Sequence, residues 1–119
     1  MTVKRITANL NAPSIPALKA FYQDLFGLDV LMDLGWIATL GAAASAPVQL
    51  NLATTGGEGT PVPELSIEVD NVEELHARAV ELGHDILYGP EDESWGVRRF
   101  MLHDPADNLV NVLQHVSVK

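Results

Sequence analysis

The sequence of 119 residues contains no cysteine and only seven basic residues. The missing cysteines exclude disulfides, thiolate zinc sites and cysteine nucleophiles. Sixteen acidic residues bring the net charge to −9, which argues against a nucleic-acid partner because phosphate binding needs clustered positive charge. No apolar run approaches the roughly 18 residues of a membrane span, so we expect no membrane insertion and a cytoplasmic protein.

The hydrophobic content of 47% is enough for one domain over residues 1–119. Two segments, 14–27 and 70–83, have the apolar spacing of amphipathic helices. In the first, Ser14 is placed to cap the start and Gly27 to end the helix, and the apolar stripe consists of Ile15, Leu18, Phe21, Leu25 and Phe26. In the second, Asp70 and Glu73 have capping-box spacing and Gly83 is the stop, and the stripe consists of Val72, Leu75, Ala79 and Leu82.

Each predicted helix follows an alternating, strand-like run, at residues 6–11 and 64–70, and precedes three more. These are 28–33, 35–41 and 47–53 after the first helix, then 84–89, 96–103 and 108–115 after the second. The order βαβββ therefore occurs twice, with equivalent positions 56 to 60 residues apart, such as Gly27 and Gly83 or Asn51 and Asn111. We predict an α+β fold of two βαβββ modules, residues 1–57 and 62–119, joined by a Gly- and Pro-rich hinge at 54–63.

The strand alternation also predicts which side chains line a site. If the apolar residues of each strand face the helix of its module, the polar ones lie on the opposite, concave face. These are Thr7, Asn9, Gln49, Asn51, Glu64, Ser66, Glu68 and Asn111. A sheet face of short polar groups favours a wet pocket over a merely solvated surface. The two histidines of the last strand-turn-strand segment, His103 and His115, lie at its opposite ends and cannot share a metal, and we expect all four histidines at ordinary surface positions.

Three segments carry a resemblance to the vicinal oxygen chelate superfamily, which includes glyoxalases, extradiol dioxygenases and bleomycin resistance proteins. They are LKAFYQDLFGLDV, LSIEVDNVEELHARAVELG and WGVRRFMLHDPADNLVNVLQ, and together with their flanks they cover nearly the whole chain. The resemblance implies two βαβββ modules forming a cleft, commonly completed in a homodimer. It also implies metal ligands on the first and last strands of each module, at Thr7, Asn51 (or Gln49), Glu64 and Asn111 in this chain.

Those four positions depart from the usual His, Gln and Glu set, because Thr and Asn are weak ligands for a transition metal. The sequence is therefore most similar to the metal-free, bleomycin-resistance-like branch, and we expect neither a metal nor a cofactor. Two tryptophans, Trp36 and Trp95, are candidate flat walls for a planar or cationic ligand. Arg98 and Arg99 alternate faces, so one of them points into the cleft; the alternation leaves the choice open, and Arg99 joins the candidate binding residues.

Two kinds of function follow. The first is a dimeric, non-enzymatic protein that sequesters a small molecule such as a planar or cationic antibiotic. The second is a metal-independent isomerase or lyase in which Glu64, desolvated in the cleft, acts as general base. A divalent-metal lyase or dioxygenase is a third, less favoured alternative, for which Mg²⁺ or Mn²⁺ would suit the oxygen ligands. The loops 41–47 and 89–96 are candidate lids.

Overall fold

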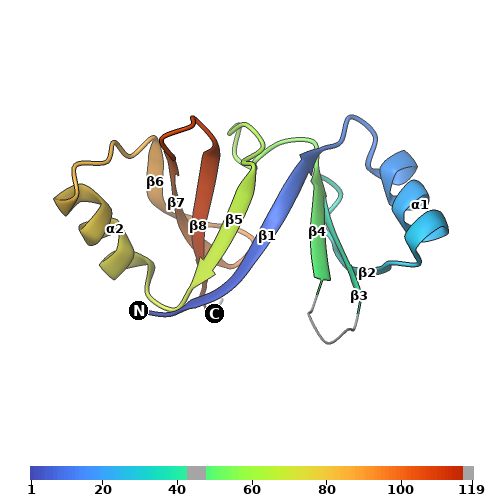
Figure 1. Cartoon of the computed structure of the whole chain (residues 1–119), viewed down its shortest axis with the longest axis horizontal. Coiled ribbons are helices and arrows are strands. Elements are labelled where there is room, and N and C mark those ends of the chain that lie inside the picture. The colour runs from blue at the N-terminus through green and yellow to red at the C-terminus, as the bar shows by residue number, and fades with distance from the viewer. Residues whose placement is uncertain (43–47, 117–119) are drawn as a thin grey trace. The chain divides into compact units, whose positions relative to one another are not determined.

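The computed structural model describes residues 1–42 and 48–116 of the chain. They form two compact units, one within residues 7–62 and the other of residues 1–6 together with residues 63–116. Each unit contains one helix packed on one face of a four-stranded sheet (Figure 1), so the predicted α+β architecture of two βαβββ modules is confirmed. The two described helices have 12 and 10 residues, and neither qualifies as a membrane-spanning segment.

In the first unit the strand order is β2-β3-β4-β1, with β1 and β4 parallel. Helix α1 packs on β3 and β4. The elements are β1 (Val3–Asn11), α1 (Ile15–Phe26), β2 (Asp29–Asp33), β3 (Ile37–Ala42) and β4 (Val48–Ala53).

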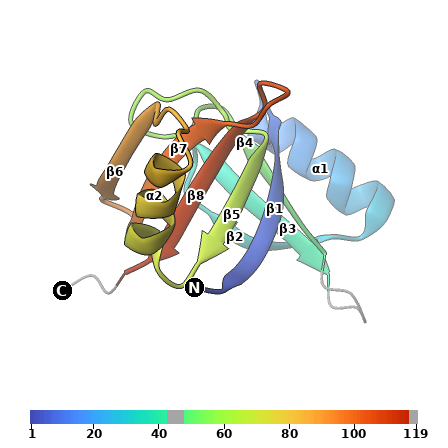
Figure 2. The ribbon, with the colours of Figure 1, turned by 60° about the vertical axis from the view of Figure 1, so that its left-hand side comes forward.

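In the second unit the strand order is β5-β8-β7-β6, with β5 and β8 parallel. Helix α2 lies across β7 and β8 (Figure 2). The elements are β5 (Leu65–Val69), α2 (Val72–Glu81), β6 (Tyr88–Glu93), β7 (Val97–His103) and β8 (Leu109–His115).

The first six residues belong to the second unit, which differs from the predicted boundaries of 1–57 and 62–119. The Thr2 amide donates to Asp70 Oδ1 at 2.8 Å, and the Asp70 amide donates back to the Thr2 carbonyl at 3.1 Å. Lys4 and Arg5 form ion pairs with Glu68 at 3.9 and 3.3 Å. Contacts between segments far apart in sequence therefore set this boundary. The spacing of 56 to 60 residues between equivalent positions of the two repeats does not reveal such contacts.

Both helices begin and end close to the predicted residues. The Ser14 hydroxyl caps α1 by accepting from the Ala17 amide, and Gly27 follows its last turn at φ +68°. In α2 the cap is Asn71, whose side chain accepts from the Glu74 amide, so the predicted capping box of Asp70 and Glu73 is wrong. Asp70 is not the cap because its carboxylate binds the Thr2 amide instead.

Each unit has its own apolar core between helix and sheet. The first core is built on buried Ala12, Ile15, Ala38, Leu40 and Leu52, and the second on Val69, Val72, Ala79, Phe100 and Val112.

Not every apolar residue that we assigned to the helix-facing set is buried. On α1, Ile15, Leu18 and Tyr22 face the core, whereas Phe21, Leu25 and Phe26 are exposed. The apolar positions of β1 that were expected to face the helix are Ile6, Ala8 and Leu10. Of these three, only Leu10 packs against the first core, and Ile6 and Ala8 are exposed. Leu82, directly after the last residue of α2, is exposed as well. The predicted stripes are therefore too wide, because a 3.6-residue period allows neighbouring apolar residues to fall on either side of the buried line.

The strand that follows α2 is not the one predicted at 84–89. Strand β6 begins at Tyr88 and includes the acidic residues up to Glu93, whereas residues 84–87 form no strand. Pro90 and three carboxylates concealed this strand, because proline and acidic residues are depleted in strands and tolerated at sheet edges. Most of the candidate lid at 89–96 is therefore an edge strand. The other candidate lid, at 41–47, falls mainly outside the described residues.

The predicted hinge at 54–63 is a folded loop with its own hydrogen bonds. The Gly56 amide donates to the Thr60 carbonyl at 2.8 Å, and the Thr60 hydroxyl donates to the Gly57 carbonyl at 2.7 Å. Gly56 and Gly57 are buried. A Cβ at position 56 would collide with the Pro61 carbonyl and the Thr60 hydroxyl. The loop therefore closes on itself, and a side chain at Gly56 would prevent this.

We expect the substitution Gly56→Ala to lower the free energy of unfolding by about 1–3 kcal/mol, because the added methyl overpacks backbone atoms. Urea denaturation of the purified variant measures this. Gly59→Ala in the same loop is the control: it meets no atom within 4 Å but sits at φ +76°, so only about 1 kcal/mol of backbone strain is expected. Equal losses in the two variants would contradict the close packing inferred at Gly56.

Candidate functional site

In the first unit, the sheet face opposite α1 carries a chain of polar side chains. The Thr39 hydroxyl donates to Asn51 Oδ1 at 2.5 Å, and Asn51 Nδ2 donates to Asn9 Oδ1 at 2.6 Å. Thr7 is buried on β1, and Gln49 alternates with Leu50 and so shares the face of Asn51. The structure thus brings Asn9 and Asn51 together as predicted, and both polar atoms of the Asn51 side chain have protein partners.

The second unit repeats this arrangement around Asn111. Asn111 on β8 lies opposite Ser66 on β5 and Met101 on β7, and its Nδ2 donates to the Ser66 hydroxyl at 3.2 Å. The residue is 8% exposed, and within the described residues its Oδ1 accepts no hydrogen bond. A buried acceptor without a donor costs roughly 1–3 kcal/mol, so this atom is a position where a ligand group would be favoured.

The difference between the two units comes from one strand neighbour. Asn51 lies beside Thr39, which supplies a hydroxyl donor, whereas Asn111 lies beside Met101, which has none. The two asparagines occupy equivalent positions in the repeat, yet only Asn51 is satisfied by the protein. Within the described residues, the polar face of the second unit therefore has a buried acceptor without a protein donor at Asn111, whereas Asn51 in the first unit has its donor in Thr39.

Glu64 is an exposed residue just before β5. Its carboxylate Oε2 accepts from the Leu109 amide at 2.5 Å, and its own amide donates to the Leu109 carbonyl at 2.9 Å. These contacts tie the start of β5 to β8. The side chain is exposed and bonded to backbone, which differs from the desolvated general base that the sequence suggested.

Arg99 is the arginine that faces away from α2. Its side chain is 3% exposed, and Nη2 donates to Glu93 Oε2 at 2.9 Å. The guanidinium carbon lies 5.1 Å from the centre of the Tyr88 ring and 5.0 Å from that of Trp95. Arg98, on the helix side, pairs instead with Glu73 of α2 and with Asp92. The structure thus selects Arg99 over Arg98, a choice that the alternation had left open.

Glu93 and Tyr88 complete this cluster, and the sequence analysis missed both. The Tyr88 hydroxyl donates to Glu93 Oε1 at 2.8 Å. Burial first, and then the hydrogen bond to Glu93, raise the pKa of the Tyr88 hydroxyl above its usual value. The signal in the sequence is the pair Glu93 and Arg99, six residues apart across a turn, but the acidic run around Glu93 is typical of a loop rather than of a strand.

The two tryptophans lie in different units. Trp36 is half-buried directly before β3. Trp95 is half-buried in the turn between β6 and β7, where its ring is in contact with Arg99. The protein's own cation therefore occupies one side of the Trp95 ring.

The positions that hold metal in the resembled family do not fit a metal in this chain. Both ends of the Asn51 amide are engaged by Thr39 and Asn9, and the Glu64 carboxylate is engaged by the Leu109 amide. Thr7 and Asn111 would supply only neutral oxygens, which are weak transition-metal ligands. Within residues 1–42 and 48–116, no group of three or more histidine or acidic side chains is arranged to hold a metal ion.

Comparisons with known proteins agree with this architecture. One match covers 93% of this chain and 99% of a solved structure described as NAD-dependent benzaldehyde dehydrogenase from Legionella pneumophila, with a TM-score of 0.78 and 16% identity. For a glyoxalase/bleomycin resistance protein/dioxygenase superfamily member from Vibrio splendidus 12B01 the coverage is 95% and 99%, the TM-score 0.66 and the identity 22%. A third match covers 98% of this chain and 100% of a variant of Streptomyces coelicolor methylmalonyl-CoA epimerase, with a TM-score of 0.71 and 20% identity.

These likenesses, at such low identities, show the fold alone, and no curated protein matches the sequence. Together, the repeated βαβββ units and the polar sheet faces define a paired-module protein of the glyoxalase type. The sequence profile of the Glyoxalase/Bleomycin resistance protein/Dioxygenase superfamily matches residues 3–112. The chain belongs to this superfamily, as the resemblance implied.

Proposed function

We propose that the protein binds and sequesters a small planar organic molecule, such as a cationic antibiotic, without a metal. The observation that carries the proposal is the buried, donor-free Oδ1 of Asn111 on the polar face of the second unit, among the residues that the structure describes. An acceptor in this position selects a ligand with an N–H or O–H group, as amine- and amide-bearing antibiotics have. The net charge of −9 would also attract a cation.

The surroundings of Asn111 support a binder more than a catalyst. Glu93 is held in an ion pair with Arg99, and Glu64 is exposed and bonded to backbone, so neither is placed as a free, desolvated base. The Ser66 hydroxyl beside Asn111 adds a second polar group for orienting a ligand. The predicted homodimer stays a prediction, and the exposed Val30, Leu31 and Met32 of β2 are its natural contact surface.

The test is a thermal-shift screen of the purified protein against bleomycin and, separately, against planar cationic antibiotics, followed by calorimetry. A ligand at about 100 times its Kd should stabilise the native state by about 2.7 kcal/mol, raising the melting temperature by several degrees. Asn111→Leu should weaken that ligand about 10- to 100-fold, because the ligand donor then loses its acceptor.

The control is Asn11→Leu, which makes the same replacement at an exposed position of β1 and should leave the affinity unchanged. If Asn111→Leu binds the ligand as tightly as the unaltered protein does, the vacant acceptor is not the contact. Stabilisation by Mg²⁺ or Mn²⁺ and not by any antibiotic would contradict the metal-free proposal.

A further inference from the structure

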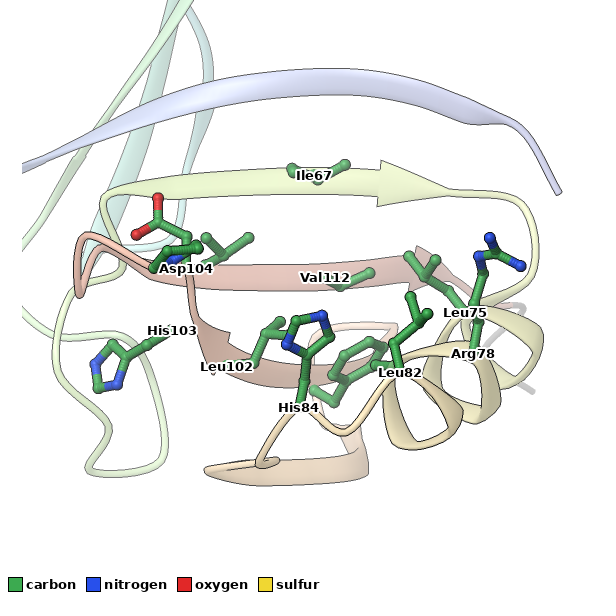
Figure 3. A pocket seen from close by; sticks show the side chains of 13 residues that line it. Ile67, Leu75, Arg78, Leu82, His84, Leu102, His103, Asp104 and Val112 are labelled. Carbon is green, nitrogen blue, oxygen red and sulfur yellow. The ribbon is translucent and has the colours of Figure 1, made fainter.

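A cavity lies on the helix side of the sheet of the second unit, between α2 and strands β5, β7 and β8. Its volume is about 350 Å³, within the range of small-molecule pockets. Its walls are almost wholly apolar and include Phe100. Leu102 and Val112 lie on the strands that form its floor (Figure 3). Its lining residues, among those that the structure describes, all belong to the second unit, and none of them lies on the polar face around Asn111.

Among the described lining residues, the charged side chains Arg78 and Asp104 lie at the two ends. Figure 3 shows Arg78 at the α2 end, beside Leu75, and Asp104 at the other end. Arg78 is exposed, and among the described residues its guanidinium has no ion-pair partner. In a chain with seven basic and sixteen acidic residues, an unpaired cation at the mouth of an apolar cavity is a distinctive feature.

The carboxylate at the opposite end is already engaged. Asp104 Oδ1 accepts from the amides of Ala106 and Asn108, and its Oδ2 accepts from the Asn108 side chain, each at 2.9 Å. These bonds, led by those from Asn108, hold the pKa of Asp104 below its usual value. The Asp104 carboxylate therefore stabilises its own turn. Arg78 is the charged side chain of the lining that can pair with a ligand.

We propose that this cavity binds a small amphipathic carboxylate, with its hydrocarbon chain along Leu102 and Val112 and its carboxylate on Arg78. The apolar walls account for the chain, since burial of methylenes drives such binding. The guanidinium accounts for the head group, because it pairs with a carboxylate in bidentate geometry. The position of His84, which extends over the cavity between Leu82 and Leu102 in Figure 3, provides a second nitrogen-bearing group at the rim.

The experiment is an NMR titration of the full chain with hexanoate, octanoate and decanoate. Methyl signals of Leu75, Leu102 and Val112 should shift and saturate, while those of Leu40 and Leu52 in the first unit should not. Affinity should rise about fourfold for each added methylene until the chain outgrows the cavity. Absence of saturable shifts at the cavity methyls for all three probes would overturn the proposal.

Two variants separate the head group from the chain. Arg78→Gln should weaken the binding of octanoate about tenfold. Lys19→Gln on α1, which removes the same charge elsewhere, should leave the affinity for octanoate unchanged. Leu82→Trp, at an exposed position of the lining, should obstruct the cavity and weaken every probe. Octyltrimethylammonium should bind less tightly than octanoate, and equal or tighter binding of this cation would overturn the assignment of a carboxylate ligand.

Discussion

Replacing Glu93 with leucine should lower the free energy of unfolding by about 3–5 kcal/mol, the largest single-residue effect we expect in this protein. Glu93 and Arg99 are each 3% exposed at the side chain, and their ion pair is enclosed by the rings of Tyr88 and Trp95. Leucine would leave the buried guanidinium without the carboxylate of Glu93. Equilibrium urea denaturation, followed by tryptophan fluorescence and by circular dichroism, measures the loss.

The matched control is Asp92→Asn on the same strand. Asp92 also pairs with an arginine, Arg98, but its side chain is 74% exposed, and exposed pairs contribute about 0–1 kcal/mol. A double variant, Arg99→Met with Glu93→Leu, should regain much of the stability lost by Glu93→Leu, because apolar residues of similar size replace buried pairs well. If Glu93→Leu cost no more than Asp92→Asn, the pair would not be buried as described.

The second large effect is that the same substitution at two equivalent positions should change the free energy of unfolding in opposite directions. Asn51→Leu should lower the free energy of unfolding by about 2–3 kcal/mol, because Thr39 and Asn9 both lose their partner. Asn111→Leu should instead raise it by about 1 kcal/mol, because a buried acceptor without a donor is removed. Ser66, which loses the Asn111 amide, keeps other interactions.

Denaturation of both variants by urea checks this pair of expectations. The denaturation slope m should stay constant, so that the midpoints report stability directly. Destabilisation of equal size at both positions would mean that Asn111 is satisfied like Asn51, and it would remove the support for a ligand at Asn111. A stabilised Asn111→Leu that also loses ligand affinity would show that the protein retains an unfavourable buried group for binding.

Much of the site could be anticipated from alternation alone. Side chains of a strand alternate between its two faces, and the apolar Leu52 and Val112 are expected to face the helices. Their neighbours Asn51 and Asn111 must therefore lie on the opposite faces. The hydrogen bonds from Asn51 to Asn9 and from Asn111 to Ser66 lie on those faces. Alternation is local, so it survives without knowledge of the tertiary structure.

What alternation could not supply is the identity of the neighbour across the sheet. Register decides that Thr39 lies beside Asn51 and Met101 beside Asn111, and this choice alone leaves one amide oxygen satisfied and the other vacant. The same holds for Arg99, whose partner Glu93 sits in a strand that its acidic composition concealed.

The sequence by itself determined the superfamily, the repeated βαβββ order, the helix ends at Ser14 and Gly27, and the polar sheet faces. The superfamily follows from the resemblance of three segments to known members, and the other features follow from local periodicity and from the conformational preferences of single residues. The tertiary structure decided the attachment of Met1–Ile6 to the second unit, the buried Arg99 and Glu93 pair, and the cavity beneath α2. Each of these depends on contacts between residues distant in the chain, and the free energy of such contacts is set by burial and register, which a linear pattern does not contain.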